Sequence, residues 1–195
     1  MMIDTNGRSK IKLLAIGGSA GSLTVVLKIL PLLKKNMNFA VVIIFHRKRY
    51  DDSSLLKLLT DRTEFIVKEA EEKEQMRPGV IYLAPPDYHL LVEKDETFSL
   101  DDSEKVNFSR PSIDVTFESA SEVLGDKLAC LLLSGSNADG VAGLMKAKAS
   151  HALVFIQDPA SAEVSYMPKL ATERVPFELL IKDDNIEELI RFLAR

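Results

Sequence analysis

Three side chains with complementary chemistry follow apolar runs of this sequence: Ser19, His46 and Asp139. A serine hydroxyl is a weak nucleophile until a base removes its proton, and a neutral imidazole is such a base. A buried carboxylate can orient the imidazole and stabilise its protonated form. The residue types therefore match a Ser-His-Asp triad, which would transfer the acyl group of an ester or amide to the serine.

The segment around Ser19 has the pattern of a strand that turns into a helix. Residues 13–16 are apolar, and from Ser22 onward apolar residues recur at helical spacing. Between them, residues 17–21 fit Gly-x-Ser-x-Gly, a tight turn that exposes a serine beside a helix N-terminus. Glycine-rich turns also bind phosphates or dinucleotides, so this segment alone leaves a nucleophile and an anion-binding loop open.

The rest of the chain alternates between apolar runs and helical patterns. Residues 39–45 and 128–133 are apolar throughout, as in strands of a parallel sheet covered by helices. Residues 80–84, 88–93 and 97–100 are short runs separated by turn residues, which favours an antiparallel hairpin near residues 80–100. The sequence predicts an α/β fold: a doubly wound, mainly parallel sheet with helices on both faces and this inserted β-hairpin. Sites in such folds lie at the carboxyl ends of strands.

Polar residues mark the expected helix starts. We expect Ser112 to be the N-cap of one helix, and Asp183 or Asp184 to cap the last helix. Asp139 precedes a helical pattern that begins near Val141, so capping that helix is an alternative or additional role for its carboxylate.

The composition excludes several classes of protein. A net charge of -4 gives no general attraction to nucleic acid or anionic lipid. No apolar run approaches the roughly 20 residues that span a bilayer. The single cysteine, Cys130, lies in an apolar run, which argues against disulfides and for a reduced, buried thiol. We expect a cytoplasmic protein with a polar tail over residues 1–10 and one domain over residues 11–195.

Three motifs, in this order, resemble the catalytic domain of the chemotaxis protein-glutamate methylesterases, the CheB family. Residues 17–22 resemble the family's serine turn, residues 43–46 its strand ending in histidine, and residues 134–140 its Thr/Ser-Gly-x-x-x-Asp-Gly loop. Supporting similarity lies in residues 77–85, 110–114, 157–159 and 167–168. By this resemblance, Ser19 is the nucleophile, His46 the base and Asp139 the residue that orients the base.

The resemblance also implies the reaction and its partners. The implied reaction hydrolyses γ-glutamyl methyl esters on the cytoplasmic helices of methylated chemoreceptors, and glutamine deamidation at the same positions is a second implied activity. No metal ion, organic cofactor, nucleic acid or membrane insertion is implied. Backbone N–H groups near Ala20 and Ser136 are candidates for binding the oxyanion. Arg47 and Arg110 are candidates for binding substrate.

Departures from the family pattern keep other functions open. Ala20 stands where a hydroxyl residue is usual, residues 47–49 (Arg-Lys-Arg) replace Met-Pro, and residues 136–137 (Ser-Asn) replace Met-Gly. One alternative is a catalytically weakened module that binds receptors or signalling proteins. Another is a nucleotide-binding domain, although Gly-x-Gly-x-x-Gly is absent and His46 stands where an acidic residue would bind a ribose.

The resemblance does not include the family's N-terminal receiver domain. We therefore expect constitutive activity or control by another chain, such as a separate receiver domain or a sensor kinase. Arg47 and its basic neighbours form either a solvated loop or a cationic rim that attracts an acidic protein. Arg110 either shapes the mouth of a pocket or anchors the helix that begins at Ser112. We assign His89 and His151 no chemical role.

Overall fold

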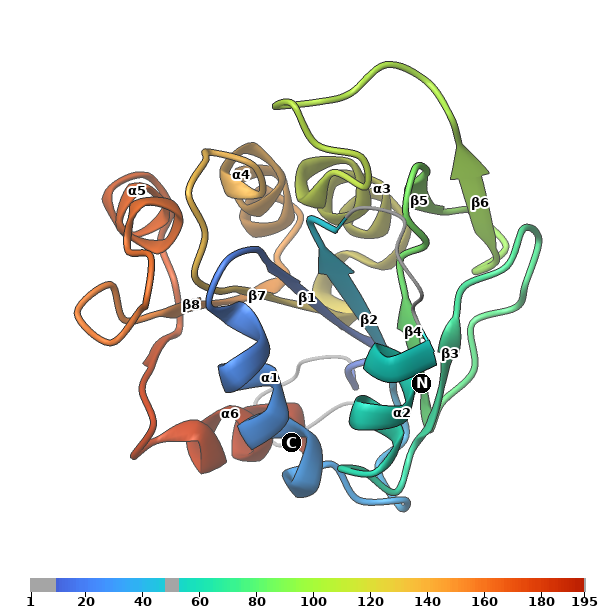
Figure 1. Ribbon diagram of the computed structural model, residues 1–195, viewed down its shortest axis with the longest axis horizontal. Helices are drawn as coiled ribbons and strands as arrows, with labels where there is room; N and C mark the ends of the chain where they lie inside the picture. Colours follow the sequence, from blue (N-terminus) through green and yellow to red (C-terminus); the bar gives the residue numbers. More distant parts are fainter. Residues whose placement is uncertain (1–9, 48–52, 195) are drawn as a thin grey trace.

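The computed structural model describes residues 10–47 and 53–194, and a seven-stranded parallel sheet runs through its centre (Figure 1). From one edge to the other, the strands are β3 (Ile66–Glu69), β4 (Val80–Leu83), β2 (Ala40–Phe45), β1 (Leu13–Gly18), β7 (Leu128–Leu132), β8 (Leu153–Gln157) and β9 (Leu179–Ile181). Each strand is parallel to its neighbours. The first strand of the chain therefore lies in the middle of the sheet.

Helices cover both faces of this sheet (Figure 1). One face carries α1 (Ser22–Ile29), α2 (Ser53–Thr60) and α6 (Ile186–Leu193), and the other carries α3 (Ile113–Leu124), α4 (Val141–Ala149) and α5 (Tyr166–Arg174). Short 3-10 helices, η1 (Leu30–Leu32) and η2 (Gly125–Lys127), follow α1 and α3. The prediction of a doubly wound α/β fold is confirmed. No helix within the described ranges is long and apolar enough to cross a bilayer.

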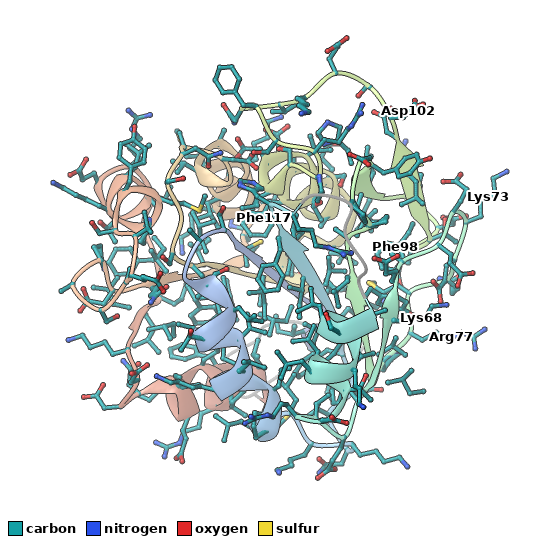
Figure 2. All side chains as sticks on the ribbon, in the orientation of Figure 1. Lys68, Lys73, Arg77, Phe98, Asp102 and Phe117 are labelled. Carbon is teal, nitrogen blue, oxygen red and sulfur yellow. The ribbon has the colours of Figure 1, made fainter. Side chains whose placement is uncertain are left out.

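The central strands are apolar along their whole length because both of their faces are covered. Every residue of β1, β2, β7 and β8 is buried. Successive side chains alternate between the two faces, so Leu13 belongs to the core beneath α3 to α5 and Leu14 to the core beneath α1 and α6. Figure 2 shows Phe117 of α3 pointing into the interior, whereas Lys73 and Arg77 point outward.

The chain changes faces between two neighbouring strands. β1 leads into α1 on one face, and β7, its neighbour in the sheet, leads into α4 on the other face. Connections that leave adjacent strands in opposite directions open a crevice at the carboxyl ends of those strands. The sheet therefore places the predicted Ser19 turn and the predicted Asp139 loop on the two sides of such a switch point.

The predicted hairpin is confirmed, with a different extent. Strands β5 (His89–Val92) and β6 (Phe98–Asp101) form a two-stranded antiparallel sheet. The run at residues 80–84, which we grouped with the hairpin, instead supplies β4 of the parallel sheet. All of β4 is buried, since it lies between β2 and β3. Tyr82 of β4 packs edge-on against Phe98 of β6, with ring centroids 4.7 Å apart.

The last helix begins later than the sequence predicts. Asn185, and not Asp183 or Asp184, is the N-cap residue of α6. Its Oδ1 accepts a hydrogen bond from the N–H of Lys182 at 2.7 Å, and its Nδ2 donates to the carbonyl of Leu180 at 2.8 Å. This side chain closes the turn before the helix, and helical geometry starts only after the turn.

The cysteine prediction is confirmed. Cys130 lies in β7 as a free thiol that is fully buried. Burial raises the pKa of this thiol, because the apolar core disfavours the charged thiolate. Cys130 is therefore a packing residue of the core and not a nucleophile.

Candidate active site

Ser19 lies in the turn between β1 and α1. Its N–H donates to the carbonyl of Ser134 at 2.9 Å, and its own carbonyl accepts from the N–H of Ser22 at 3.1 Å and from Ser22 Oγ at 2.6 Å. Gly21, the N-cap residue of α1, has φ 78°, a left-handed conformation that suits glycine. These bonds hold the backbone of Ser19 at the N-terminus of α1, with the residue half-buried at the carboxyl edge of the sheet.

His46 follows β2 at the same level of the sheet. β1 and β2 pair in parallel with Gly18 opposite Phe45, so Ser19 and His46 are the next residue of each strand. The N–H of His46 donates to the carbonyl of Gly18 at 3.4 Å, which extends the ladder by one step. The strand register therefore brings the predicted nucleophile and the predicted base side by side.

Asp139, in the loop after β7, contacts His46 directly. Asp139 Oδ2 lies 2.7 Å from His46 Nε2, and the side chain of Asp139 is completely buried while that of His46 is 13% exposed. Because an ionised carboxylate only accepts hydrogen bonds, Nε2 carries the ring proton in this pair and Nδ1 is left as the basic nitrogen. The pair thus has the arrangement of a general base and its orienting acid.

Helix α3 holds the carboxylate of Asp139. The Ser112 hydroxyl donates to Oδ1 at 2.7 Å, the Ile113 N–H donates to Oδ2 at 2.7 Å, and the Asp114 N–H donates to Oδ1 at 3.1 Å. Burial by itself raises the pKa of Asp139, but the hydrogen bonds from His46 and from the start of α3 outweigh it and hold the pKa below its usual value. The N-terminus of this twelve-residue helix also favours a negative charge. The buried carboxylate is therefore ionised.

This arrangement changes two of the predicted helix caps. Asp139 caps α3, and the N-cap of α4 is instead Gly140, with φ 95°. Ser112 is the N-cap residue of α3, as predicted, but its hydroxyl bonds Asp139 and not the helix backbone. Ile113 also packs close to β1, since a Cβ on Gly17 would lie 2.3 Å from the side chain of Ile113.

Sequence reasoning gave His89 no role, but the structure places it behind Ser112. His89 is 1% exposed, and its Nδ1 accepts a hydrogen bond from the Ser112 N–H at 3.1 Å. Its Nε2 lies 3.0 Å from the carbonyl oxygen of Glu104, so Nε2 carries the proton. His89 thus links the hairpin to the residue that bonds Asp139. No motif around His89 signals this contact, because the partners lie 23 and 15 residues away.

Ser19 follows the strand next to the one that leads to His46, but its hydroxyl is not hydrogen-bonded to the pair. No hydrogen bond joins Ser19 Oγ to His46 or to another group in the described part of the chain. Catalytic hydrogen bonds are often long without substrate and shorten when substrate binds. The structure therefore brings His46 and Asp139 into contact and places Ser19 beside them.

The two oxyanion candidates lie on neighbouring loops. Ala20 and Ser136 are both exposed. Ser134 joins their loops, since its Oγ donates to the carbonyl of Ala20 at 2.7 Å and its carbonyl accepts the Ser19 N–H. Among the described residues, neither Ala20 nor Ser136 uses its N–H in a hydrogen bond. Both donors are thus free for a substrate oxygen at this edge of the sheet.

Arg47 is held by contacts within the protein. Its guanidinium forms an ion pair with Glu69 at the end of β3 and donates to the carbonyl of Ala84 at 3.2 Å. Only 11% of the side chain is exposed. These contacts tie the end of β2 to the ends of β3 and β4, which is a structural role. Residues 48 and 49 of the predicted cationic rim lie outside the described residues.

Arg110 anchors the loop that precedes α3. Its guanidinium donates to the carbonyl of Asp102 and, at 2.6 Å, to the carbonyl of Ser103. Of the two roles predicted for Arg110, these contacts favour the anchor. The loop from β6 to α3 arches over this end of the molecule, so Arg110 contributes to the shape of the site's rim (Figure 1).

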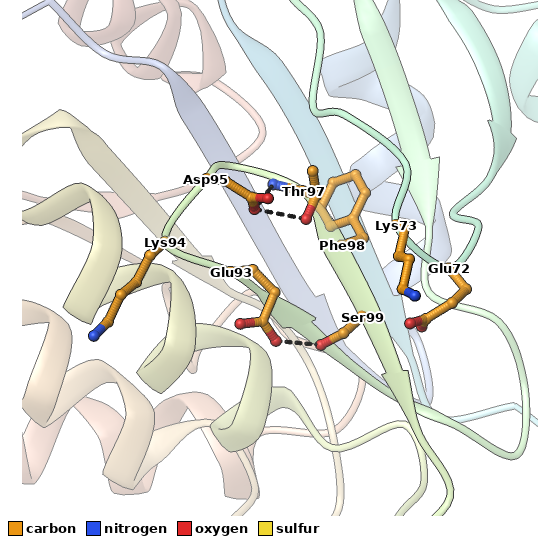
Figure 3. A pocket seen from close by; sticks show the side chains of 8 residues that line it. All are labelled: Glu72, Lys73, Glu93, Lys94, Asp95, Thr97, Phe98 and Ser99. Carbon is orange, nitrogen blue, oxygen red and sulfur yellow. Dashed lines mark hydrogen bonds between the residues drawn. The ribbon is translucent and has the colours of Figure 1, made fainter.

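A separate surface hollow of about 700 Å³ lies at the turn of the hairpin (Figure 3). Its carboxylates are used locally: Glu93 accepts from Ser99 Oγ at 2.5 Å, and Asp95 accepts from Thr97 Oγ1 at 2.7 Å. The turn lies at the amino ends of the strands, far from Ser19, because Glu96 pairs with Lys12 just before β1. Within the described ranges, no three His, Cys, Asp or Glu side chains form a metal-binding cluster.

Asp114 makes the stability of this region dependent on pH. Burial, with the nearby charge of Asp139, raises the pKa of Asp114 to about 6, although the Gly143 N–H bonds it at 2.7 Å. The folded state then holds a proton that the unfolded chain has released, so the free energy of unfolding falls as the pH rises from about 4 to about 6. Asp114→Asn removes this titration. We therefore compare the free energy of unfolding of the variant with that of wild type. We expect this difference to be about 2 kcal/mol more favourable to the variant at pH 7.5 than at pH 4.5.

Urea unfolding of both proteins at the two pH values measures this gain. The lowered pKa of Asp139 has the opposite sign, since it contributes stability that is lost as the pH falls, but Asp139 is present in both proteins. Asp61→Asn, at an exposed aspartate, is the matched control and should show no gain. A difference between Asp114→Asn and wild type that is the same at both pH values would contradict the prediction.

Comparison with known families decides what kind of protein this site belongs to. Residues 14–190 match the family described as CheB methylesterase. The chain belongs to the CheB methylesterase family. The match includes Ser19, His46 and Asp139, and it favours an enzyme over the nucleotide-binding alternative.

Individual members of the CheB methylesterase family align with most of the chain. A putative protein-glutamate methylesterase/protein-glutamine glutaminase of Leptospira interrogans serogroup Icterohaemorrhagiae serovar copenhageni (strain Fiocruz L1-130) is 44% identical over 176 residues, 90% of this chain and 91% of that protein. The protein-glutamate methylesterase/protein-glutamine glutaminase of Thermotoga maritima is 34% identical over 83% of this chain and 48% of its own length. This chain thus spans about half of the Thermotoga relative.

A solved structure shares the whole fold. The crystal structure of the Thermotoga maritima CheB methylesterase catalytic domain has a TM-score of 0.86 and 32% sequence identity, and the match covers 94% of this chain and 100% of that chain. The seven-stranded sheet and its flanking helices are therefore the fold of a CheB methylesterase catalytic domain.

Proposed function

We propose that this protein hydrolyses the methyl esters of glutamate side chains on chemoreceptors and deamidates glutamine side chains at the same positions. The observation that carries the proposal is the 2.7 Å contact between His46 and Asp139, beside the serine of the β1–α1 turn. Membership of the CheB methylesterase family and the names of the relatives support the choice of reaction and substrate.

In the proposed mechanism, Ser19 is the nucleophile. Ser19 Oγ attacks the ester carbonyl carbon while its proton passes to Nδ1 of His46, which forms a tetrahedral intermediate with a negatively charged oxygen. The bond to the methoxy group then breaks, and His46 returns the proton to that oxygen, so methanol leaves. A water molecule attacks the resulting acyl-enzyme while His46 takes its proton, and as the bond between the acyl carbon and Ser19 Oγ breaks, His46 gives this proton to Oγ. The product acid leaves and ionises to the glutamate carboxylate, and Ser19 is restored.

The remaining groups stabilise charge during these steps. Asp139 keeps Nε2 of His46 protonated, so that Nδ1 is the base, and its negative charge stabilises the imidazolium. The N–H groups of Ala20 and Ser136 bind the oxyanion in this proposal. Each such donor typically stabilises a transition state by about 3 kcal/mol. A metal ion or organic cofactor takes no part in the proposed steps.

The proposed substrate also sets the place of action and the partners. Methylated glutamates on the cytoplasmic helices of chemoreceptors would be reached from the cytoplasm. The names of the relatives, which specify protein-bound glutamate and glutamine, support this class of substrate.

Release of radiolabelled methanol from methylated chemoreceptor fragments tests the proposal. We expect release to be linear in the concentration of the protein, and ammonia release from unmodified glutamine sites tests the deamidase activity in the same way. A heat-denatured sample is the control for spontaneous ester hydrolysis. If the folded protein binds several receptor fragments but releases no methanol from any of them, the proposal is wrong and the protein is a binding module.

A further inference from the structure

Three exposed aromatic side chains surround the candidate active site, and we call them the aromatic rim: Tyr88, Phe108 and Tyr166. They are 40%, 96% and 55% exposed. Tyr88 follows the carboxyl end of β4, Phe108 lies in the loop from β6 to α3, and Tyr166 is the first residue of α5. All three therefore lie at the edge of the sheet that carries Ser19 and His46. Exposed Phe177, in contrast, precedes β9 at the opposite edge.

Phe108 occupies an unfavourable position. Val106 and Ser109 exchange two backbone hydrogen bonds, of 3.2 and 2.9 Å, around a two-residue turn. The turn residues Asn107 and Phe108 have φ 49° and φ 61°, the left-handed region that normally takes glycine or asparagine. A phenylalanine here loses the burial of its ring and also adopts a strained backbone. Such outliers point to a function that outweighs the cost.

This turn is fixed to the catalytic loops. Asn107 Nδ2 donates to Asp114 Oδ2 at 2.8 Å. Asn137, two residues before Asp139, donates from Nδ2 to the carbonyl of Asn107 at 3.3 Å and to Ser109 Oγ at 3.2 Å. The ring of Phe108 is therefore presented to solvent by a turn that is hydrogen-bonded to the loop carrying Asp139 and Ser136.

Tyr166 lies on the other side of the same loop. The N–H of the next residue, Met167, donates to the carbonyl of Gly135 at 3.0 Å. The side chain of Met167 also packs against Gly135, where an added Cβ would lie 2.5 Å from Met167. The turn that carries Phe108 is thus bonded to the middle of loop 134–140, at Asn137, and the residue after Tyr166 is bonded to the start of this loop, at Gly135. Tyr88 precedes His89, whose ring holds Ser112.

We infer that the aromatic rim docks a polypeptide, specifically the apolar residues that flank a methylated glutamate on an amphipathic helix of the receptor. The inference rests on the proposed function and adds the surface by which that function would select its substrate. Aromatic side chains are enriched in the centres of protein interfaces because they bury large areas at little cost in side-chain entropy. The rim is continuous with the catalytic loops, so the reacting glutamate and the docked helix belong to one substrate.

The charges near the rim argue against an acidic partner. Asp101 ends β6, Asp102 and Glu104 lie in the loop that leads to Phe108, and all three are exposed, as is Lys105 of the same loop. These carboxylates disfavour an acidic stretch of substrate on this side of the site. Arg110, whose guanidinium bonds two neutral carbonyls of this loop, offsets part of their charge, whereas Arg47 is paired with Glu69.

The test compares a protein substrate with a small one. The Phe108→Ala/Tyr166→Ala double variant and wild type are assayed on a methylated receptor fragment and on N-acetylglutamate γ-methyl ester. We expect the ratio of the two kcat/KM values, protein over small ester, to fall at least ten-fold in the double variant. Ile66→Ala is the matched control, because Ile66 is 66% exposed at the amino end of β3. It should leave the ratio within two-fold of wild type.

Two outcomes overturn the inference. An unchanged ratio shows that the rim does not recognise the protein, and an equal loss on both substrates shows that it acts through the catalytic loops and not by docking. A binding measurement separates this inference from the proposed function. The receptor fragment is titrated calorimetrically into Ser19→Ala protein and into Ser19→Ala protein that also carries the two rim substitutions. We expect the protein with the rim substitutions to bind the fragment ten-fold more weakly. Equal affinities contradict docking even if no methanol is released by wild type.

Discussion

Replacing Ser19 with alanine is expected to lower the turnover of a glutamyl methyl ester by about ten-thousand- to million-fold. The variant keeps the backbone bonds to Ser134 and Ser22, so the β1–α1 turn should remain intact. It lacks the oxygen that forms the acyl-enzyme, and only oxyanion binding and substrate orientation would remain to accelerate direct attack by water. Methanol release under single-turnover conditions measures the loss.

The control for Ser19→Ala is Ser54→Ala, at an exposed serine of α2 on the far side of the molecule from α3. It should keep the turnover of wild type. Circular dichroism should show that both variants are folded. If Ser19→Ala keeps turnover within ten-fold of wild type, Ser19 is not the nucleophile, and the β1–α1 turn has another function.

Asp139→Asn is expected to lower turnover by about ten-thousand-fold, and also to lower stability, because the Ile113 N–H loses its acceptor at the start of α3. An asparagine that turns its Nδ2 toward His46 donates to Nε2, so the ring proton moves to Nδ1. The ring then cannot accept the proton of Ser19, and the negative charge that stabilises the imidazolium is also lost. The pH dependence of kcat/KM should change as well, because the base has lost its ionised partner.

Ser112→Ala separates the orientation of Asp139 from its charge. This variant keeps the carboxylate and the two N–H donors of Ile113 and Asp114, and it removes only the 2.7 Å bond from the hydroxyl. We expect turnover to fall about ten-fold, the usual effect of one hydrogen bond to a charged group.

Asp61→Asn serves as the control for Asp139→Asn. Equal turnover of Asp139→Asn and wild type would exclude the proposed role of Asp139.

Much of the site follows from the pattern of the sequence. The runs at residues 39–45 and 128–133 are apolar throughout, which indicates strands covered on both faces, and such strands are parallel and end at one common edge. His46 and the Asp139 loop come directly after these runs, so their proximity is a consequence of the fold class. The glycine-rich turn after residues 13–16 adds Ser19 at the same edge.

The parts that sequence reasoning missed depend on contacts between distant residues. His89 bonds the backbone of Ser112, which lies 23 positions later, and no pattern near either residue requires this contact. Arg47 forms an ion pair with Glu69 on β3. A basic residue in this position fits either a structural ion pair or a contact with substrate, and the sequence does not show which partner it has. β4 has four residues between turns and so resembled the hairpin strands. Its pairing with β2, which lies earlier in the chain beyond α2 and β3, left no local signal in the sequence.

The bond between His46 and Asp139 has a consequence for folding. It joins residues 93 positions apart in sequence, on strands that flank β1 from opposite sides. Closing so large a loop costs chain entropy, and parallel strands pair slowly because their contacts are non-local. β2, β1 and β7 must be paired, and α3 must be docked, before the carboxylate can reach the imidazole. We therefore expect the contact between His46 and Asp139 to be among the last to form, so that activity regained on refolding would report molecules whose central sheet is complete.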